Sequence, residues 1–163
     1  MKYIDTSVIV SALDAADLSS IKSIEFLKKP EKVISELVIA ELNSVLFRNR
    51  NFVSLMDELS GDRSSSSYAA ITYILQKFAL LYLPSQQIQT ETPIGRYSNV
   101  MAFAIELASK VPMRTLDLLH LSYAHSIANL TRSEIEFVTR DREFEVYSNR
   151  IYDEAGIKIN YLV

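Results

Sequence analysis

The sequence predicts an α/β domain with a mostly parallel sheet, and three observations support this. Short apolar runs typical of strands alternate with longer segments in which apolar residues recur every three or four positions. Apolar residues make up 48% of the chain, enough for a buried core. The length of 163 residues is close to that of one compact domain, so we expect residues 1–163 to form a single domain.

The expected strands are short apolar runs bounded by polar or turn residues, and they lie at 2–5, 32–34, 79–83, 135–139 and 157–162. Pro84 closes the third of them, and a polar loop is expected to follow over 85–92. Because helices separate these strands, the strands are expected to run parallel.

The expected helices share a spacing of three or four between apolar residues and span 6–13, 18–27, 36–47, 68–78, 94–110, 116–129 and 142–147. Pro30 and Pro112 end the second and fifth of them. Ser35 is suited to cap the third, which is expected to continue through 48–59. The stretch GDRSSSS at 61–67 predicts a turn followed by a helix cap, not a linker between domains.

Composition excludes several classes of protein. Without cysteine, the chain has neither disulfides nor thiolate metal sites, which suits a reducing compartment. Asp5 interrupts the first apolar run, so no signal peptide is expected, and no apolar run reaches the ~18 residues of a membrane span. We therefore expect a cytoplasmic protein with no membrane partner. A net charge of −3 argues against a general nucleic-acid coat protein, unless basic patches or bound cations compensate.

Four acids occupy positions that call for an explanation. Asp5 and Asp141 follow the first and fourth strands, where a helix cap or an Asx-turn is the simpler interpretation. Asp117 heads the apolar face of its helix, where it also complements the helix dipole. Glu41 borders an apolar face, although a surface position is the alternative.

A parallel sheet can bring all four acids to one edge, beyond the carboxyl ends of its strands. Two carboxylates ~4 Å apart repel by about 4 kcal/mol at an effective dielectric of ~20. Four such groups require protonation or a cation, and an all-oxygen ligand set selects Mg²⁺ or Mn²⁺, one or two ions. The interpretation is therefore a metal site formed by Asp5, Glu41, Asp117 and Asp141.

Hydroxyl groups and basic side chains adjoin these acids. Thr6, Ser7 and Thr139 are candidates to orient carboxylates or metal-bound water, although capping explains Thr6 or Ser7 equally well. Three arginines are candidates to hold the phosphates that flank a scissile bond, with a solvated surface role as the alternative: Arg114, Arg140 and Arg142. For His120 and His125 we expect a surface or supporting position rather than metal ligation.

Four segments in this order resemble the PIN domain, the fold of VapC-type ribonuclease toxins: IDTSVIVSAL at 4–13, VISELVIAEL at 33–42, LDLLHLSYA at 116–124 and FVTRDREF at 137–144. The resemblance implies a three-layer α/β/α fold with a five-stranded, mostly parallel sheet. It also implies RNA as substrate, a catalytic role for the four acids, a homodimer, and a small antitoxin protein as partner. Residues 48–112 carry no motif of the family.

Two other functions remain open. A PIN-like domain that keeps its acids can serve as a catalytically silent RNA-binding or assembly module. Aspartyl phosphoryl transfer from Asp5 is the second, but Ser7 stands where phosphatases of that kind have a second aspartate. One apolar stripe is a candidate dimer contact, although it can equally pack on its own core: Phe52, Leu55, Met56 and Leu59.

Overall fold

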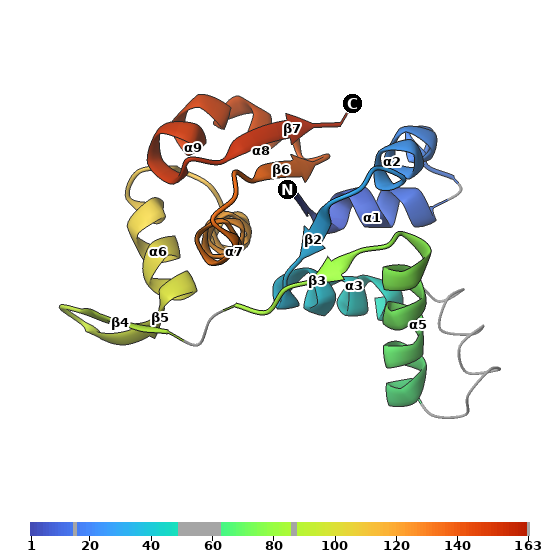
Figure 1. Cartoon of the computed structure of the whole chain (residues 1–163), viewed down its shortest axis with the longest axis horizontal. Coiled ribbons are helices and arrows are strands. Elements are labelled where there is room, and N and C mark those ends of the chain that lie inside the picture. Colours follow the sequence, from blue (N-terminus) through green and yellow to red (C-terminus); the bar gives the residue numbers. More distant parts are fainter. Residues whose placement is uncertain (15, 49–62, 86–87, 163) are drawn as a thin grey trace.

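A computed structural model describes residues 1–14, 16–48, 63–85 and 88–162 (Figure 1). In chain order the elements are β1 Lys2–Ile4, α1 Thr6–Leu13, α2 Ser20–Leu27, β2 Lys32–Ile34, α3 Glu36–Arg48, α5 Arg63–Lys77, β3 Leu81–Tyr82, β4 Gln89–Thr92, β5 Gly95–Ser98, α6 Asn99–Ala108, α7 Thr115–Thr131, β6 Glu136–Thr139, α8 Arg142–Val146, α9 Ser148–Ala155 and β7 Lys158–Tyr161. The dimer stripe expected within 52–59 lies outside the described residues.

The central sheet has five strands in the order β3-β2-β1-β6-β7, and all its neighbouring pairs are parallel. The predicted α/β fold with a five-stranded sheet is therefore confirmed. The register pairs Ile4 with Val138. Asp5 and Thr139 come one residue later, so they lie side by side at the carboxyl ends of the two central strands.

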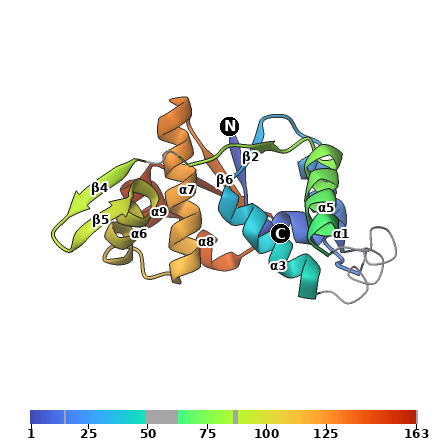
Figure 2. The same ribbon diagram turned by 90° about the horizontal axis from the view of Figure 1, so that it is seen from below.

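One contiguous apolar core joins the sheet to its helices. Tyr3, Phe137 and Phe144 are among its largest fully buried side chains, and their rings stack in that order with centroids 5.3 and 4.7 Å apart. Figures 1 and 2 both show α6 and α7 on one side of the molecule and α1, α3 and α5 on the other. The carboxyl ends of β1 and β6 therefore open between α3 and α7, which are in contact.

The prediction for 85–110 is wrong in its first half. A helix from 94 and a loop up to 92 were expected, but β4 and β5 form an antiparallel hairpin and α6 begins only at Asn99. Gly95 has φ 137°, a conformation that residues with a Cβ rarely adopt, and it turns the chain. The hairpin is largely exposed, with Ile94 74% exposed, so its strands carry no buried stripe that sequence could reveal.

Helix α9 was not expected either. Its eight residues bury only Ile151 and Ala155, and Gly156 ends it at φ 68°. The sequence does show this pair of apolar residues four positions apart, followed by glycine. A pattern of one such pair is too short to predict a helix. Within the described residues, no helix is both long enough and apolar enough to cross a membrane.

Candidate active site

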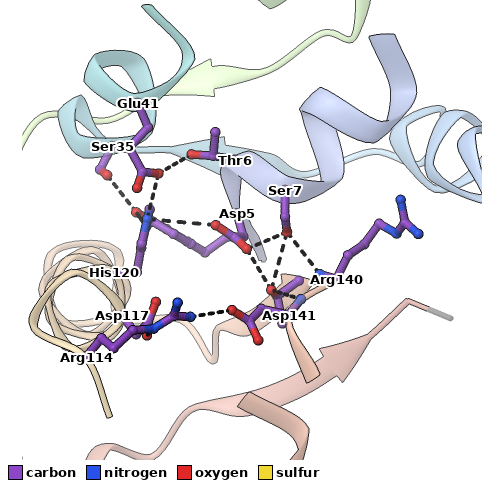
Figure 3. Close-up of polar contacts among 12 residues, drawn as sticks. Asp5, Thr6, Ser7, Ser35, Glu41, Arg114, Asp117, His120, Arg140 and Asp141 are labelled. Carbon is purple, nitrogen blue, oxygen red and sulfur yellow. Dashed lines mark hydrogen bonds and ion pairs between the residues drawn. The ribbon is translucent and has the colours of Figure 1, made fainter. Parts of the chain in front are cut away.

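Asp5, at the end of β1, is held by two hydroxyl groups (Figure 3). Its Oδ2 accepts hydrogen bonds from the hydroxyls of Ser7 and Thr139, each 2.6 Å long. It stands at the N-cap position of α1, yet its side chain makes no capping bond, so capping does not explain it. Because both donors bind Oδ2, the second oxygen, Oδ1, is left facing His120 Nε2 at 3.8 Å.

Glu41 repeats this pattern from helix α3. Its Oε2 accepts from the hydroxyl of Thr6 and contacts Nε2 of His120 at 2.8 Å. Burial alone raises the pKa of Glu41, but the bonds from His120 and Thr6 outweigh it and the net pKa is lowered. The carboxylate is therefore ionised at neutral pH. The two hydroxyls that the sequence left undecided have separate partners: Ser7 binds Asp5 and Thr6 binds Glu41.

His120 lies inside the protein, so of the surface and supporting positions expected for it, the structure excludes the surface one. Its side chain is 3% exposed, and Nδ1 contacts the hydroxyl of Tyr3 at 3.3 Å. Burial lowers its pKa, but the hydrogen bond to Glu41 and the charges of Asp5 and Asp117 raise it by more. One atom each of Asp5, Glu41 and His120 lies within 4.8 Å of the others.

His125, by contrast, takes no part in this cluster. Its ring stacks on Phe103 with centroids 4.1 Å apart, and Nδ1 contacts the carbonyl of Ala155 at 3.1 Å.

Asp117 and Asp141 form the second half of the cluster, and Arg114 joins them. Its guanidinium donates one hydrogen bond to Asp117 Oδ2, 2.9 Å long, and another to Asp141 Oδ2, 2.7 Å long. Burial raises the pKa of Asp117; Arg114 opposes this, but the pKa remains above its ordinary value. Asp141 also caps α8, because Oδ1 accepts from the backbone N–H of Glu143 at 2.9 Å. The capping interpretation is thus correct for Asp141 without excluding a place in the pocket.

All four acids line one pocket of about 390 Å³ between α3 and α7. Its wall also includes Thr6, Ser7, His120, Arg114 and the apolar side chains Val45, Leu116 and Phe144. Asp5 and Asp117 are buried, 6% and 8% exposed, whereas Glu41 and Asp141 are half-buried. Arg48 also lines the pocket, so four carboxylates face two arginines and the pocket keeps a net negative charge.

Arg140 and Arg142 are not among the described residues that line the pocket. The side chain of Arg140 points away from the acids and donates hydrogen bonds to Ser11 and Asp17 (Figure 3). Arg142 is exposed at the first turn of α8. A phosphate contact for these two arginines remains a prediction, and of the three predicted arginines Arg114 is the one that contacts the acids.

The donor set suits a hard divalent cation. Among the described residues, no hydrogen bond reaches Asp5 Oδ1, Glu41 Oε1 or Asp117 Oδ1. In Asp5 and Glu41 the other carboxylate oxygen is bound by two donors. Such second contacts orient metal ligands in proteins. Sequence reasoning left a supporting position open for His120 but missed Tyr3 and Ser35. The only available signal was that His120 follows Asp117 by three on one helix face.

An α/β domain with four carboxylates gathered at the ends of its parallel strands defines a class of domain suited to binding hard divalent cations. The PIN domain family matches residues 2–149 of the chain. The chain therefore belongs to the PIN domain family.

Solved structures share this fold. A chain of VapBC2 from Rickettsia felis, in a structure bound to a DNA fragment from their promoter, superposes with a TM-score of 0.59, 16% identity and full coverage of both chains. VapC20 from Mycobacterium tuberculosis, described as a Sarcin-Ricin loop cleaving toxin, superposes with a TM-score of 0.58 and 12% identity over 90% of this chain and 94% of that one. A chain of VapBC-1 from nontypeable Haemophilus influenzae superposes with a TM-score of 0.56 and 18% identity over 99% of this chain and 98% of that one. No curated protein matches the sequence significantly.

Proposed function

We propose that this PIN domain is a metal-dependent endoribonuclease that hydrolyses phosphodiester bonds of RNA with Mg²⁺ or Mn²⁺. The observation that carries the proposal is the convergence of Asp5, Glu41, Asp117 and Asp141 on one pocket. Family membership and the shared fold with a Sarcin-Ricin loop cleaving toxin support it. The cluster could equally serve a silent binding module, and the test below separates the two.

The residues divide the work by position. Asp5 and Glu41 each offer one carboxylate oxygen that is not used in hydrogen bonding among the described residues. Asp117 and Asp141 would complete the ligand set when the Arg114 guanidinium moves away from them. When bound, one or two such ions supply a nucleophilic water of lowered pKa and stabilise the leaving oxygen. Ser7, Thr139 and Thr6 hold the carboxylates in place through the bonds described above. Once released from Asp117 and Asp141, Arg114 would contact a phosphate that flanks the scissile bond.

The direct test is cleavage of a fluorogenic single-stranded RNA by the purified protein. Activity is expected with Mn²⁺ or Mg²⁺ and not with EDTA, and it is expected to return when the metal is added back in excess. Calorimetry with Mn²⁺ reports binding independently of turnover. Metal binding without cleavage of single-stranded or structured RNA would favour the silent module, and absence of both would refute the proposal.

Arg114 makes a separate prediction about metal affinity. Its side chain is 67% exposed and neutralises Asp117 and Asp141 as an internal cation, so it competes with a metal ion. Solvent screens exposed ion pairs, so each of them is weak. Arg114→Ala is therefore expected to tighten Mn²⁺ binding only modestly in calorimetry, by about two- to fivefold, while raising KM for RNA.

The matched control is Arg150→Ala, an exposed arginine of α9 that is not among the described residues lining the pocket, and it should leave both quantities unchanged. Weaker Mn²⁺ binding by Arg114→Ala would contradict the competing role.

We further propose that the protein acts in the cytoplasm as the toxin of a type II toxin–antitoxin pair, as a homodimer inhibited by a small antitoxin protein. The similarity to chains from VapBC structures supports this assignment. Co-purification of a small protein encoded beside it, and loss of RNA cleavage when that protein is bound, is the expected result.

A further inference from the structure

A series of hydrogen-bonded, buried side chains leads from the interior of the sheet to the acidic pocket. The hydroxyl of Tyr3 lies 2.6 Å from Ser35 Oγ and 3.3 Å from His120 Nδ1, and His120 Nε2 lies 2.8 Å from Glu41 Oε2. Tyr3 and Ser35 are completely buried. The imidazole ring is further enclosed by edge contacts with the rings of Tyr3 and Phe137, whose centroids each lie 6.2 Å from its own.

Which group donates in each of these hydrogen bonds follows from the carboxylate at the end of the series. An ionised carboxylate only accepts hydrogen bonds, so Nε2 must carry the proton in its contact with Glu41. The raised pKa of His120 favours a charged ring in the metal-free protein, but a cation bound beside Glu41 favours the neutral ring. In that neutral ring Nδ1 is an acceptor, and Tyr3 donates to it. Tyr3 has a single proton, so Ser35 must donate to the phenol oxygen. Every donor in the series therefore points toward Glu41.

This direction decides between two roles for His120. As a metal ligand, Nε2 would have to be unprotonated, Nδ1 would donate to Tyr3, and the bond to Glu41 would be lost. The 2.8 Å contact with Glu41 and the 3.8 Å separation from Asp5 Oδ1 favour the donor state. His120 and Thr6 then hold Glu41 Oε2 from two sides, as Ser7 and Thr139 hold Asp5 Oδ2.

We propose that His120 is a positioning residue: oriented by Tyr3 and Ser35, its Nε2–H holds Oε2 of Glu41 so that Oε1 is presented to a divalent cation. This role rests on the proposed metal-dependent function. A neutral hydrogen-bond donor beside a metal ligand orients that ligand without adding a charge that opposes the cation. Loss of such a contact reduces metal affinity by about 10- to 100-fold.

Two amide substitutions test the role of each ring nitrogen. The amide of glutamine reaches the position of Nε2 and can still donate to Glu41, whereas the shorter asparagine places its amide near Nδ1 only. His120→Gln is expected to bind Mn²⁺ within about threefold of wild type, and His120→Asn about 10- to 100-fold more weakly. Tyr3→Phe removes the donor to Nδ1 and is expected to fall between them.

His125→Asn, on the same helix but outside the cluster, is the matched control and should leave Mn²⁺ binding unchanged. Thermal unfolding shows whether each variant is folded before its affinity is compared. Equal Mn²⁺ affinities for folded His120→Gln and His120→Asn would overturn the positioning role while leaving the proposed function intact. No Mn²⁺ binding by the wild-type protein would overturn the proposed function itself, and with it this role.

Nitrogen-15 NMR of the imidazole ring gives a readout that needs no variant and no activity. The wild-type protein is expected to show a protonated Nε2 in the metal-free state, and to keep it when Mg²⁺ is added to saturation. An unprotonated Nε2 with a protonated Nδ1, in either state, would overturn the proposal and make His120 a ligand candidate instead.

Discussion

Replacing Asp5 by asparagine is expected to lower the rate of RNA cleavage by about 10²–10³-fold while leaving the protein folded. A bound metal ion stabilises the transition state by several kcal/mol, and each ~1.4 kcal/mol corresponds to a factor of ten in rate. Ser7 and Thr139 both donate to Oδ2, so the new side chain must turn its carbonyl oxygen toward them. Its NH₂ group then occupies the position of Oδ1, where a donor repels a cation.

Single-turnover cleavage of a labelled RNA in Mn²⁺ measures this loss, and calorimetry is expected to show that Mn²⁺ affinity falls with it. The control is Asp153→Asn, the same change at an exposed position of α9, which should leave both unchanged. The unfolding temperature of Asp5→Asn should be equal to or above that of wild type, because the substitution removes a buried negative charge. A variant that cleaves RNA at the wild-type rate would show that Asp5 holds no catalytic metal.

Phe137→Ala is expected to cause the largest loss of stability, about 3–5 kcal/mol. Phe137 is fully buried on β6, the strand between β1 and β7, and stacks with Tyr3 and Phe144. Removing the ring leaves a cavity at the centre of the core and takes away one wall of the His120 site. The whole free energy of unfolding of a domain is about 5–15 kcal/mol, so this variant approaches the limit of folding.

Urea unfolding followed by circular dichroism measures the change as a shift in midpoint at unchanged slope. Val146→Ala, at an α8 position that is 68% exposed, is the control and should stay within about 0.5 kcal/mol of wild type. A loss below about 1 kcal/mol for Phe137→Ala would mean that the neighbouring rings close the cavity. The two variants also separate two properties: Asp5→Asn changes chemistry at constant stability, and Phe137→Ala changes stability first.

Local sequence was sufficient for the elements that bury a regular apolar face. Helix α7 was predicted at 116–129 and spans Thr115–Thr131, and β2 was predicted with its observed bounds. The hairpin of β4 and β5 was missed because an exposed two-stranded unit owes its form to the turn at Gly95 and to its own backbone pairing. Neither leaves an apolar period in the sequence.

The order and type of the main elements, and the four unusual acids, were determined by the sequence alone, because apolar periodicity and charge within an apolar face are properties of neighbouring residues. Only the tertiary structure decided which hydroxyl serves which acid, that Arg114 rather than Arg140 or Arg142 reaches the carboxylates, and that His120 lies buried beside Glu41. These contacts join residues 35 to 134 positions apart or depend on the direction in which a side chain leaves its helix. They are set by the register of parallel strands and by the packing of α3 against α7, which local sequence does not encode.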